Sequence, residues 1–484
     1  MKIFSNNKIE YSEVTFDELY GDMRIDSDYY YPFYIRNADI IQKIPNKFVK
    51  DFMSYPQYGL SIAMNEENIG YKILKMDDII GIFADDQDAK YANISKKLFD
   101  QYKLKRFDVL FNRVNSDDFV GRTGIYLLDG EHAFASYLVR ITSEHSYQNC
   151  YLTIFLNCKY GYNSLQRVKR RAVNQANINA KELNSLKIPY PSSDFQKEIE
   201  KLLLKSNDQK KESANLYANA EKILLMELEL DNWKPKTKKF KIGDSDFEVE
   251  KTISEIDLNS AFSDDRIDAE YWQYYLLMLI KKIKKYKNGT DLLGNVFKIY
   301  DNNYFPKDTI EYRYIELGNI KSNGQIDGEL KDFGDNLPTR ARRLVQKNQV
   351  IISSIEGSLG SCALITDKYE NCICSNGFFV INSETINSET ALILLKSLPF
   401  QLLLKKGCSG TILTAINKRY FKLIPIPLID SKVQKDIQTY IKKSFKNNNI
   451  SKQLLEIAKC AVEIYIEKDE KAGIKYIERE MKLL

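Results

Sequence analysis

Apolar positions along this chain follow two different periods, and each period predicts its own kind of element. Short β-branched and aromatic runs predict half-buried strands at Asp108 to Phe111, Ala135 to Thr142, Gln349 to Ser353 and Gly377 to Ile381. Turns rich in Asn, Asp and Gly separate these runs, and helical spacing appears between them, for example from Ala391 to Leu404. The pattern predicts mixed α/β globular parts.

Two much longer helical stripes interrupt this mixture. Their apolar positions are Ile199, Leu202, Leu203, Leu216, Ala220, Ile223 and Leu224 in the first, and Ile437, Tyr440, Ile441, Leu454, Ile457, Ala461 and Ile464 in the second. Each follows a Pro-x-Pro strand and a possible capping box, Ser193 with Gln196 and Ser431 with Gln434. The polar stretch 206–211 predicts a weak point. Because an apolar stripe needs a partner, we expect the two helices to pack together, with outer faces free for other proteins.

The chain contains an internal repeat. Residues 12–30 align without a gap with 254–272, at the offset of 242 residues that separates Arg24 from Arg266. The Pro-x-Pro segments and the starts of both long helices also align, at an offset of 238. A repeat of this length is a duplicated domain with a duplicated helix, since solenoid units are far shorter. It predicts a globular domain in 1–191, a helix in 192–234, a second globular domain in 235–429, and a second helix with a C-terminal tail in 430–484.

Composition narrows the class of protein only slightly. The 71 Lys and Arg exceed the 66 Asp and Glu by five charges, too few to indicate a nucleic-acid partner without local clustering. Seven scattered cysteines fit a reduced protein. The segment MKIFSNNKIE lacks an apolar signal-peptide core, so we expect a cytoplasmic location. We expect the two histidines, His132 and His145, to be surface or turn residues.

Sequence signatures of catalysis are missing. We find no phosphate-binding or dinucleotide-binding glycine loop, no zinc-protease helix, and no Asn-Pro-Pro-Tyr or Asp-Pro-Pro-Tyr segment of amino-methyltransferases. Cys372 and Cys374 form only CxC, which does not predict a zinc site. The segment 407–410 lacks the spacing of a nucleophile elbow and reads as a turn. These observations argue against a self-contained nuclease or methyltransferase, and we predict neither a catalytic residue nor a metal site.

Local clusters of basic and amide side chains occur in both copies. Arg and Lys neutralise phosphates, whereas Arg, Asn and Gln can hydrogen-bond base edges. Such clusters also occur on ordinary solvated surfaces, but their repetition favours a function. The candidate DNA-binding residues are Asn112, Arg113, Arg122, Arg167, Lys169, Arg170, Arg171, Asn174 and Gln175 in copy one, and Arg340, Arg342, Arg343, Ser353, Ser354, Glu356, Lys405, Lys406 and Thr411 in copy two.

Nearly the whole chain resembles the specificity subunits of type I restriction-modification systems. The resemblance rests on ordered motif pairs: RIDSDYYYP with RIDAEYW, DVLFNRVNSDDFVGRTGIYL with QVIISSIEGSLGSCALI, and NQANINAKELNSLKIPYP with GTILTAINKRYFKLIPIP. It implies that each globular part is a target-recognition domain for one half of a split, asymmetric DNA site. It also implies that the two helices pack antiparallel as a spacer, whose length at ~1.5 Å per residue sets the gap between half-sites.

The resemblance implies partners and a non-catalytic role. Two methyltransferase subunits that bind S-adenosylmethionine and ATP-driven restriction subunits would assemble on this chain, which itself would bind neither cofactor. Copy one departs from the pattern at 112–118 and at Ala135-Ser136-Tyr137, which weakens the transfer of individual contacts there. The alternative that the residues leave open is a coiled-coil scaffold whose globular domains do not bind DNA. It predicts no salt-dependent DNA affinity.

Overall fold

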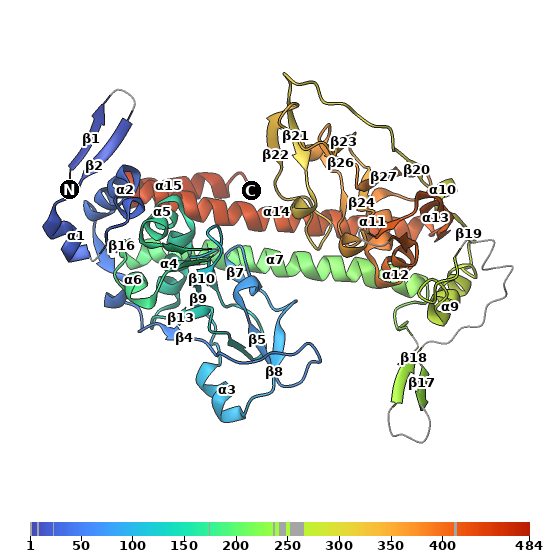
Figure 1. Cartoon of the computed structure of the whole chain (residues 1–484), viewed down its shortest axis with the longest axis horizontal. Coiled ribbons are helices and arrows are strands. Elements are labelled where there is room, and N and C mark those ends of the chain that lie inside the picture. Colours follow the sequence, from blue (N-terminus) through green and yellow to red (C-terminus); the bar gives the residue numbers. More distant parts are fainter. Residues whose placement is uncertain are drawn as a thin grey trace. The chain divides into compact units, whose positions relative to one another are not determined.

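The structure is a computed structural model that describes residues 2–6, 9–22, 24–173, 175–235, 238–241, 248–251, 266–410 and 414–484. The chain divides into two compact units (Figure 1). Unit 1 comprises Met1–Lys210 and Asn448–Leu484, and unit 2 comprises Lys211–Asn447. Helices and strands are mixed in both, which confirms the predicted fold class.

A six-stranded sheet forms the centre of unit 1, in the order β4-β13-β9-β11-β7-β6. Its strands are β4 (Gln57–Tyr58), β13 (Leu138–Ile141), β9 (Val109–Asn112), β11 (Thr123–Ile125), β7 (Phe83–Ala84) and β6 (Ile79–Ile80). All four residues of β9 are buried, because structure covers this central strand on both faces. The strands predicted around Val109 and Val139 are therefore present.

Smaller sheets and short helices surround this sheet. The strands are β1 (Lys2–Asn6) with β2 (Ile9–Glu13), β3 (Asn46–Phe48) with β16 (Lys187–Pro189), β5 (Tyr71–Leu74) with β8 (Lys90–Ala92) and β12 (His132–Phe134), and β10 (Val114–Asn115) with β15 (Gln175–Asn177) and β14 (Arg170–Ala172). The helices are α1 (Phe16–Asp22), α2 (Pro32–Gln42), α3 (Lys96–Tyr102), α4 (Ser146–Asn157), α5 (Lys159–Val168) and α6 (Ala180–Asn184). Helix α4 is apolar around most of its circumference and is correspondingly buried in the core.

Unit 2 contains two four-stranded sheets, β20-β27-β24-β25 and β22-β21-β26-β23. The strands are β20 (Lys298–Ile299), β27 (Phe378–Asn382), β24 (Val350–Ser353), β25 (Cys362–Leu364), β22 (Leu330–Phe333), β21 (Glu311–Ile315), β26 (Ile373–Ser375) and β23 (Ala341–Leu344), with the pairs β17 (Lys238–Lys241) and β18 (Glu248–Lys251), β19 (Thr290–Leu292) and β30 (Pro425–Pro427), and β28 (Cys408–Ser409) and β29 (Ala415–Ile416). The helices are α9 (Tyr274–Ile283), α10 (Leu293–Val296), α11 (Ser388–Lys396), α12 (Leu398–Lys406) and α13 (Lys418–Leu423).

The same order of elements closes both globular parts. In unit 1, α4 and α5 lead into the hairpin β14–β15, then α6 and β16. In unit 2, α11 and α12 lead into the hairpin β28–β29, then α13 and β30. Each Pro-x-Pro strand pairs antiparallel with an earlier strand, Pro189 with Asn46 and Pro427 with Thr290. The sequence repeat is thus a repeat of structure.

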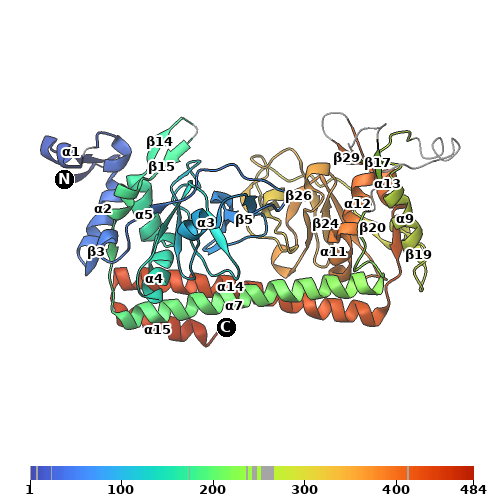
Figure 2. The same cartoon turned by 90° about the horizontal axis from the view of Figure 1, so that it is seen from below.

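The two long helices are α7 (Ser193–Glu227) and α14 (Ser431–Glu467). Within each unit their segments run side by side and antiparallel (Figure 1, Figure 2). Ser206 Oγ lies 2.9 Å from the carbonyl oxygen of Ser451 in unit 1, and Ser213 Oγ lies 2.8 Å from that of Ser444 in unit 2. The small buried serines let the helix backbones approach closely. The predicted weak point at 206–211 is therefore wrong, because its polar residues include a helix contact and α7 continues through it.

Both long helices begin where the sequence predicts, but their caps differ from the predicted boxes. Ser192 Oγ accepts a hydrogen bond from the Phe195 amide at 3.3 Å, and an Asp430 carboxylate oxygen accepts one from Lys432 at 2.8 Å. Gln196 donates instead to the carbonyl of Pro191. The capping side chains thus lie one residue before the predicted ones, and they still satisfy free amides of the first turn.

The C-terminal helix α15 (Glu470–Met481) folds back on unit 1. Glu470 accepts a hydrogen bond from the Ser192 amide at 2.8 Å. Gly473 lies against Phe195, where an added Cβ would be 2.8 Å from the ring atom Cε2. These contacts confirm that the tail packs on the first long helix.

His132 is not a surface residue, which corrects the sequence-based expectation. It lies in β12 with 2% of its surface exposed. Its Nδ1 lies 2.8 Å from Tyr126 Oη, and its Nε2 lies 3.1 Å from an Asp86 carboxylate oxygen. The polar partners explain how the ring is accommodated in the interior. His145, by contrast, lies in the turn before α4, as expected.

All seven cysteines are free thiols. Burial raises the pKa of Cys362 to about 12 and that of Cys372 to about 11. In the part of the chain that the structure describes, no group of three or more His, Cys, Asp or Glu side chains could hold a metal ion. Nor do these residues include a helix apolar and long enough to span a membrane.

Candidate nucleic-acid interface

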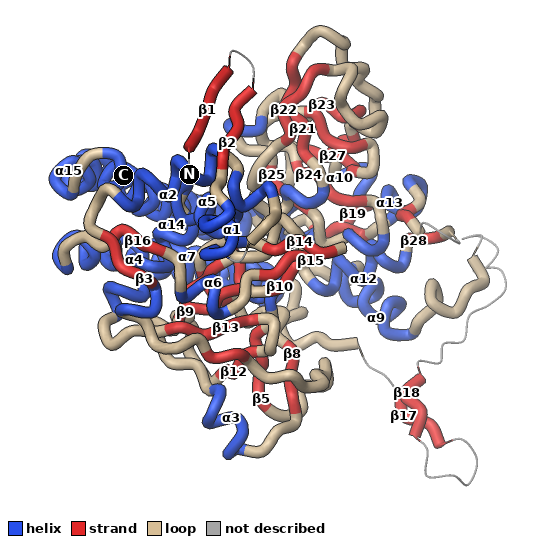
Figure 3. The backbone as a smooth tube through the Cα atoms, turned by 60° about the vertical axis from the view of Figure 1, so that its left-hand side comes forward, coloured by secondary structure: helices blue, strands red, loops and turns tan. Residues whose placement is uncertain are grey.

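A hairpin in unit 1 carries three exposed residues of the predicted set. Strands β14 and β15 are neighbours in a three-stranded sheet with β10 (Figure 3), pairing Arg170 with Asn177 and Arg171 with Ala176. Arg170 and Arg171 are exposed, as is Gln175 on the returning strand. A two-stranded ribbon has the dimensions to enter the major groove of DNA. Asn174, between the strands, lies outside the described residues.

Acidic side chains from three other segments hold these arginines. Arg170 pairs with Glu182 of α6, and Arg171 pairs with Asp28 and, at 2.9 Å, with Asp117. Exposed ion pairs contribute only about 0–1 kcal/mol each. A DNA phosphate could therefore replace the exposed carboxylates of Asp28 and Asp117 as partners of Arg171 at little cost.

Four other basic residues predicted in unit 1 lie deeper. Lys169 is 2% exposed, and its Nζ lies 3.0 Å from an Asp117 carboxylate oxygen and 3.1 Å from the Asp117 carbonyl oxygen. Its ammonium lowers the pKa of Asp117. The half-buried residues are Arg113, whose Nε donates to the Ser136 carbonyl, Arg122, whose Nη1 donates to that of Ile79, and Arg167, whose Nε donates to that of Tyr29. Lys169 thus holds the loop at Asp117 rather than facing solvent.

Asn112 and Ser353 occupy matching positions at the ends of β9 and β24. Both side chains are fully buried, and Ser353 Oγ lies 2.8 Å from Ser358 Oγ. No hydrogen bond to the side-chain carboxamide of Asn112 is found among the described residues. Each residue ends a core strand, so its side chain points into the protein and not toward a ligand at the surface.

The predicted residues of unit 2 fall into two groups. One group surrounds the hairpin β28–β29: the Ser354 side chain donates to the Gly377 carbonyl at 2.8 Å, and Glu356 pairs with the exposed Lys405 at 3.7 Å. Lys406 is buried, with its Nζ 2.8 Å from the centre of the Tyr271 ring. Thr411 lies outside the described residues.

The second group lies on and beside β23. Arg340 is exposed and pairs with Glu316 at 3.7 Å, Arg342 lies over the Phe305 ring at 4.9 Å, and Arg343 bonds to Asn303. Burial lowers the pKa of Arg343. The Arg340 carbonyl accepts from the Asn376 amide at 2.8 Å, next to the Gly377 that holds Ser354. One turn, 376–377, therefore connects the two groups.

The same backbone bonds join the core strand to the hairpin in both units. The Ile178 amide donates to the Arg113 carbonyl at 2.9 Å, and the Ile416 amide donates to that of Ser354 at 2.7 Å. In each unit the first loop residue after the central strand is thereby fixed beside the end of the hairpin. Both units present the same arrangement of a loop and a hairpin.

The acidic partners Asp28, Asp117 and Glu182 were not predicted as part of this surface. Arg171 and its two partners are 143 and 54 residues apart in the chain. No spacing rule connects residues so distant. Asp28 does lie two residues after the repeated Arg-Ile-Asp motif, which is the one sequence signal that marks its neighbourhood.

Comparison with known proteins finds similarity over parts of this chain. Residues 290–459 match the type I restriction modification DNA specificity domain. The chain is 30% identical over 160 residues to the putative type I restriction enzyme MjaX specificity subunit of Methanocaldococcus jannaschii, covering 32% of this chain and 37% of that protein. It is 27% identical over 145 residues to the type I restriction enzyme EcoKI specificity subunit of Escherichia coli, covering 29% of this chain and 31% of that protein. The alignments thus span about a third of the curated relatives.

A solved structure also aligns with most of the chain. It is the type I restriction-modification system S subunit from M. genitalium, with 12% identity, a TM-score of 0.40, and coverage of 88% of this chain and 95% of that one. Most of the stretch that matches the type I restriction modification DNA specificity domain, residues 290–447, lies in unit 2. Over these segments the chain is similar to specificity subunits of type I restriction enzymes, which confirms the resemblance drawn from its repeated motifs.

Proposed function

We propose that this chain is the DNA sequence-specificity subunit of a type I restriction-modification complex, in which each unit reads one half of a split DNA site. The observation that carries the proposal is the duplication itself. Most of the match to the DNA specificity domain lies in unit 2, and unit 1 repeats the order of elements found there and the backbone bonds between loop and hairpin. Two similar DNA-recognition domains on one chain favour a DNA site with two parts.

The exposed cations and the neighbouring polar side chains would have different tasks in this function. Arg170, Arg171, Arg340 and Lys405 are exposed and would meet phosphates, which sets register without reading sequence. Gln175, Ser354 and Glu356 belong to the hairpins or the adjacent loops and would approach base edges. Four other predicted residues are buried and would instead hold these hairpins and loops in place: Asn112, Lys169, Ser353 and Lys406.

Assembly with other subunits forms part of the proposal. Two methyltransferase subunits and the restriction subunits would bind the chain, and S-adenosylmethionine and ATP would belong to those partners. The chain itself would be non-catalytic. Exposed outer faces of α7 and α14, such as those with Lys201 and Lys442, leave room for a protein partner.

The affinity of the assembled complex for duplex DNA at several salt concentrations tests this function. We expect the affinity to fall steeply as salt rises from about 50 to about 200 mM, because DNA binding releases counterions. The double variant Arg170→Ala/Arg171→Ala should weaken binding and lower the salt slope by about 1 per lost phosphate contact. Lys97→Ala, which removes an exposed charge from α3, is the matched control and should change little.

Absence of salt-dependent affinity for DNA would contradict the proposal. The coiled-coil scaffold would then be the better account of the chain.

A further inference from the structure

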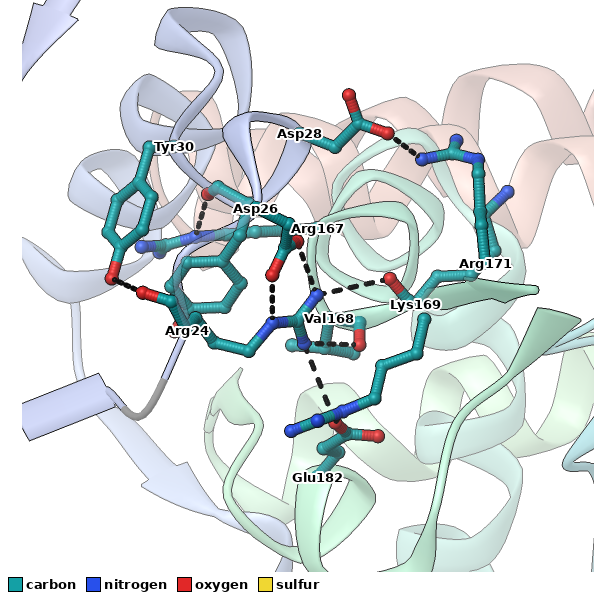
Figure 4. Close-up of polar contacts among 11 residues, drawn as sticks. Arg24, Asp26, Asp28, Tyr30, Arg167, Val168, Lys169, Arg171 and Glu182 are labelled. Atoms are coloured by element: carbon teal, nitrogen blue, oxygen red, sulfur yellow. Dashed lines mark hydrogen bonds and ion pairs between the residues drawn. The ribbon is translucent and has the colours of Figure 1, made fainter. Parts of the chain in front are cut away.

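The repeated Arg-Ile-Asp motif forms a buried clamp in unit 1. Arg24 is 5% exposed, and its Nε and Nη2 lie 2.6 and 2.7 Å from the two carboxylate oxygens of Asp26 (Figure 4). Its Nη1 donates to the carbonyl of Val168 at 2.9 Å, and its Nη2 donates to that of Lys169 at 3.2 Å. Val168 ends α5, and Lys169 immediately precedes β14. The guanidinium is thus committed to the protein at the base of the hairpin.

Unit 2 contains the same clamp at the repeat offset. Arg266 Nε and Nη2 lie 2.5 and 3.0 Å from the carboxylate oxygens of Asp268. Its Nη2 also donates, at 3.3 Å, to the carbonyl of Cys408, the first residue of β28. In both units the arginine of the motif therefore donates to a backbone carbonyl at the base of the hairpin.

Aromatic neighbours of the clamp are duplicated as well. The Arg24 guanidinium lies 4.8 Å from the centre of the Tyr29 ring, and that of Arg266 lies 4.7 Å from the centre of the Tyr271 ring. The next aromatic residue in each copy donates to the carbonyl of the arginine, Tyr30 Oη at 3.1 Å and Trp272 Nε1 at 2.6 Å. A planar guanidinium with a bidentate carboxylate and a stacked ring is held in one orientation. Lysine cannot reproduce that set of contacts.

Glu182 connects the clamp of unit 1 to the hairpin side chains. Its carboxylate lies 3.5 Å from Arg24 Nη1 and also pairs with Arg170 on β14. The same residue completes the capping box of α6, where it bonds to the Asn179 amide at 2.9 Å. Displacement of Arg24 would therefore disturb both the backbone at the hairpin base and the carboxylate beside Arg170.

We propose that Arg24 and Arg266 are positioning residues, each of which fixes the hairpin of its own unit and thereby sets the base preference of one half-site. This inference rests on the proposed function. Neither guanidinium has to touch DNA. Each acts through the carbonyl at the base of the hairpin, so its loss changes the angle at which the exposed side chains meet the bases.

The test is the methylated DNA motif produced by the full chain assembled with its methyltransferase. We expect Arg24→Lys to relax base discrimination by about tenfold at positions of one half-site and to leave the other half-site unchanged, since a misplaced bidentate contact costs about that much. Arg266→Lys should relax the opposite half-site. Arg36→Lys is the matched control, because it changes an exposed ion pair on α2 and should leave both half-sites intact.

Asp26→Asn and Asp268→Asn provide a second pair of variants if a lysine variant does not fold. The Asp26 carboxylate is 45% exposed, so its loss retains the core while it releases the arginine. We expect each to act on the same half-site as its partner arginine, while the complex still assembles and its thermal midpoint falls because a largely buried guanidinium loses its carboxylate. Unchanged preferences, or equal relaxation of both half-sites by either variant, would overturn the inference. A wild-type complex that methylates no split motif would contradict the proposed function, and the inference with it.

Discussion

Lys169, Arg170 and Arg171 are consecutive in the sequence, yet their surroundings differ. Lys169 is buried against Asp117, whereas Arg170 and Arg171 are exposed on β14. The sequence predicts a basic cluster here, but composition does not tell which cation faces solvent. That depends on the end of α5 at Val168 and on a carboxylate 52 residues before Lys169. Burial therefore divides the predicted cluster into one residue that holds a loop, Lys169, and two that face solvent, Arg170 and Arg171.

Asp117→Asn tests whether carboxylates restrain the cations of the hairpin. The change removes one of the two carboxylate partners of Arg171, as well as the carboxylate beside the buried Lys169, and leaves the Arg171 guanidinium freer to meet phosphates. We expect affinity for DNA without the target site to rise roughly three- to tenfold at low salt, with a steeper salt dependence. Binding by fluorescence anisotropy measures the change. Asp100→Asn on α3 adds the same charge away from the hairpin, and an equal effect of both variants would indicate net charge alone.

His132 gives unit 1 a defined response to acid. Burial lowers the pKa of His132 below its ordinary 6.5, although Asp86 opposes this shift. The folded state therefore binds fewer protons than the unfolded state below about pH 6.5. Stability should be fully present above that pH and should fall as the pH drops from about 6.5 toward the folded pKa. Proton NMR of the ring and denaturation between about pH 5.5 and 7.5 measure both effects. A His132→Gln variant as acid-sensitive as the wild type would contradict this assignment.

The long helices show what periodicity predicts at the scale of elements. The apolar stripe placed α7 and α14, their starting points and their mutual packing, because burial of such a stripe requires a partner. The weak point predicted at 206–211 was wrong, since serines such as Ser206 and Ser213 are small enough to lie in the contact between the helices. The offset of 238 residues also relates Ser206 to Ser444 and Ser213 to Ser451, so the serine contact belongs to the repeat. The hairpins, by contrast, have too few residues for a periodic signal.

Substitutions at Ser206 test the close approach of the helices. Ser206→Ala removes hydroxyl bonds to Ser451 and should lower the free energy of unfolding by about 1 kcal/mol. Ser206→Leu adds bulk to a fully packed contact and should cost more, about 1–3 kcal/mol beyond that. Urea denaturation of the full chain measures both. A leucine variant as stable as the wild type would show that the helices do not approach closely at this position.

At the scale of the whole molecule, the repeat was the most informative feature of the sequence. It predicted two related globular parts, their mixed elements and the long helices, because each copy constrains the interpretation of the other. The candidate DNA-binding surface could be predicted only as local clusters of basic and amide side chains, since the contacts that shape this surface join residues far apart in the sequence. Arg24 and Val168, 144 residues apart, are one example. The repeated motif aligned Arg24 with Arg266 but did not predict a role for either.

The map of methylated bases in the host DNA tests the central claim most directly. We expect the complex that contains this chain to methylate a motif with two specified segments separated by a fixed number of unspecified bases, one segment for each unit. Loss of the chain should abolish that methylation. A single continuous motif, or methylation that persists without the chain, would contradict the claim that each unit of this chain recognises one half of a split DNA site.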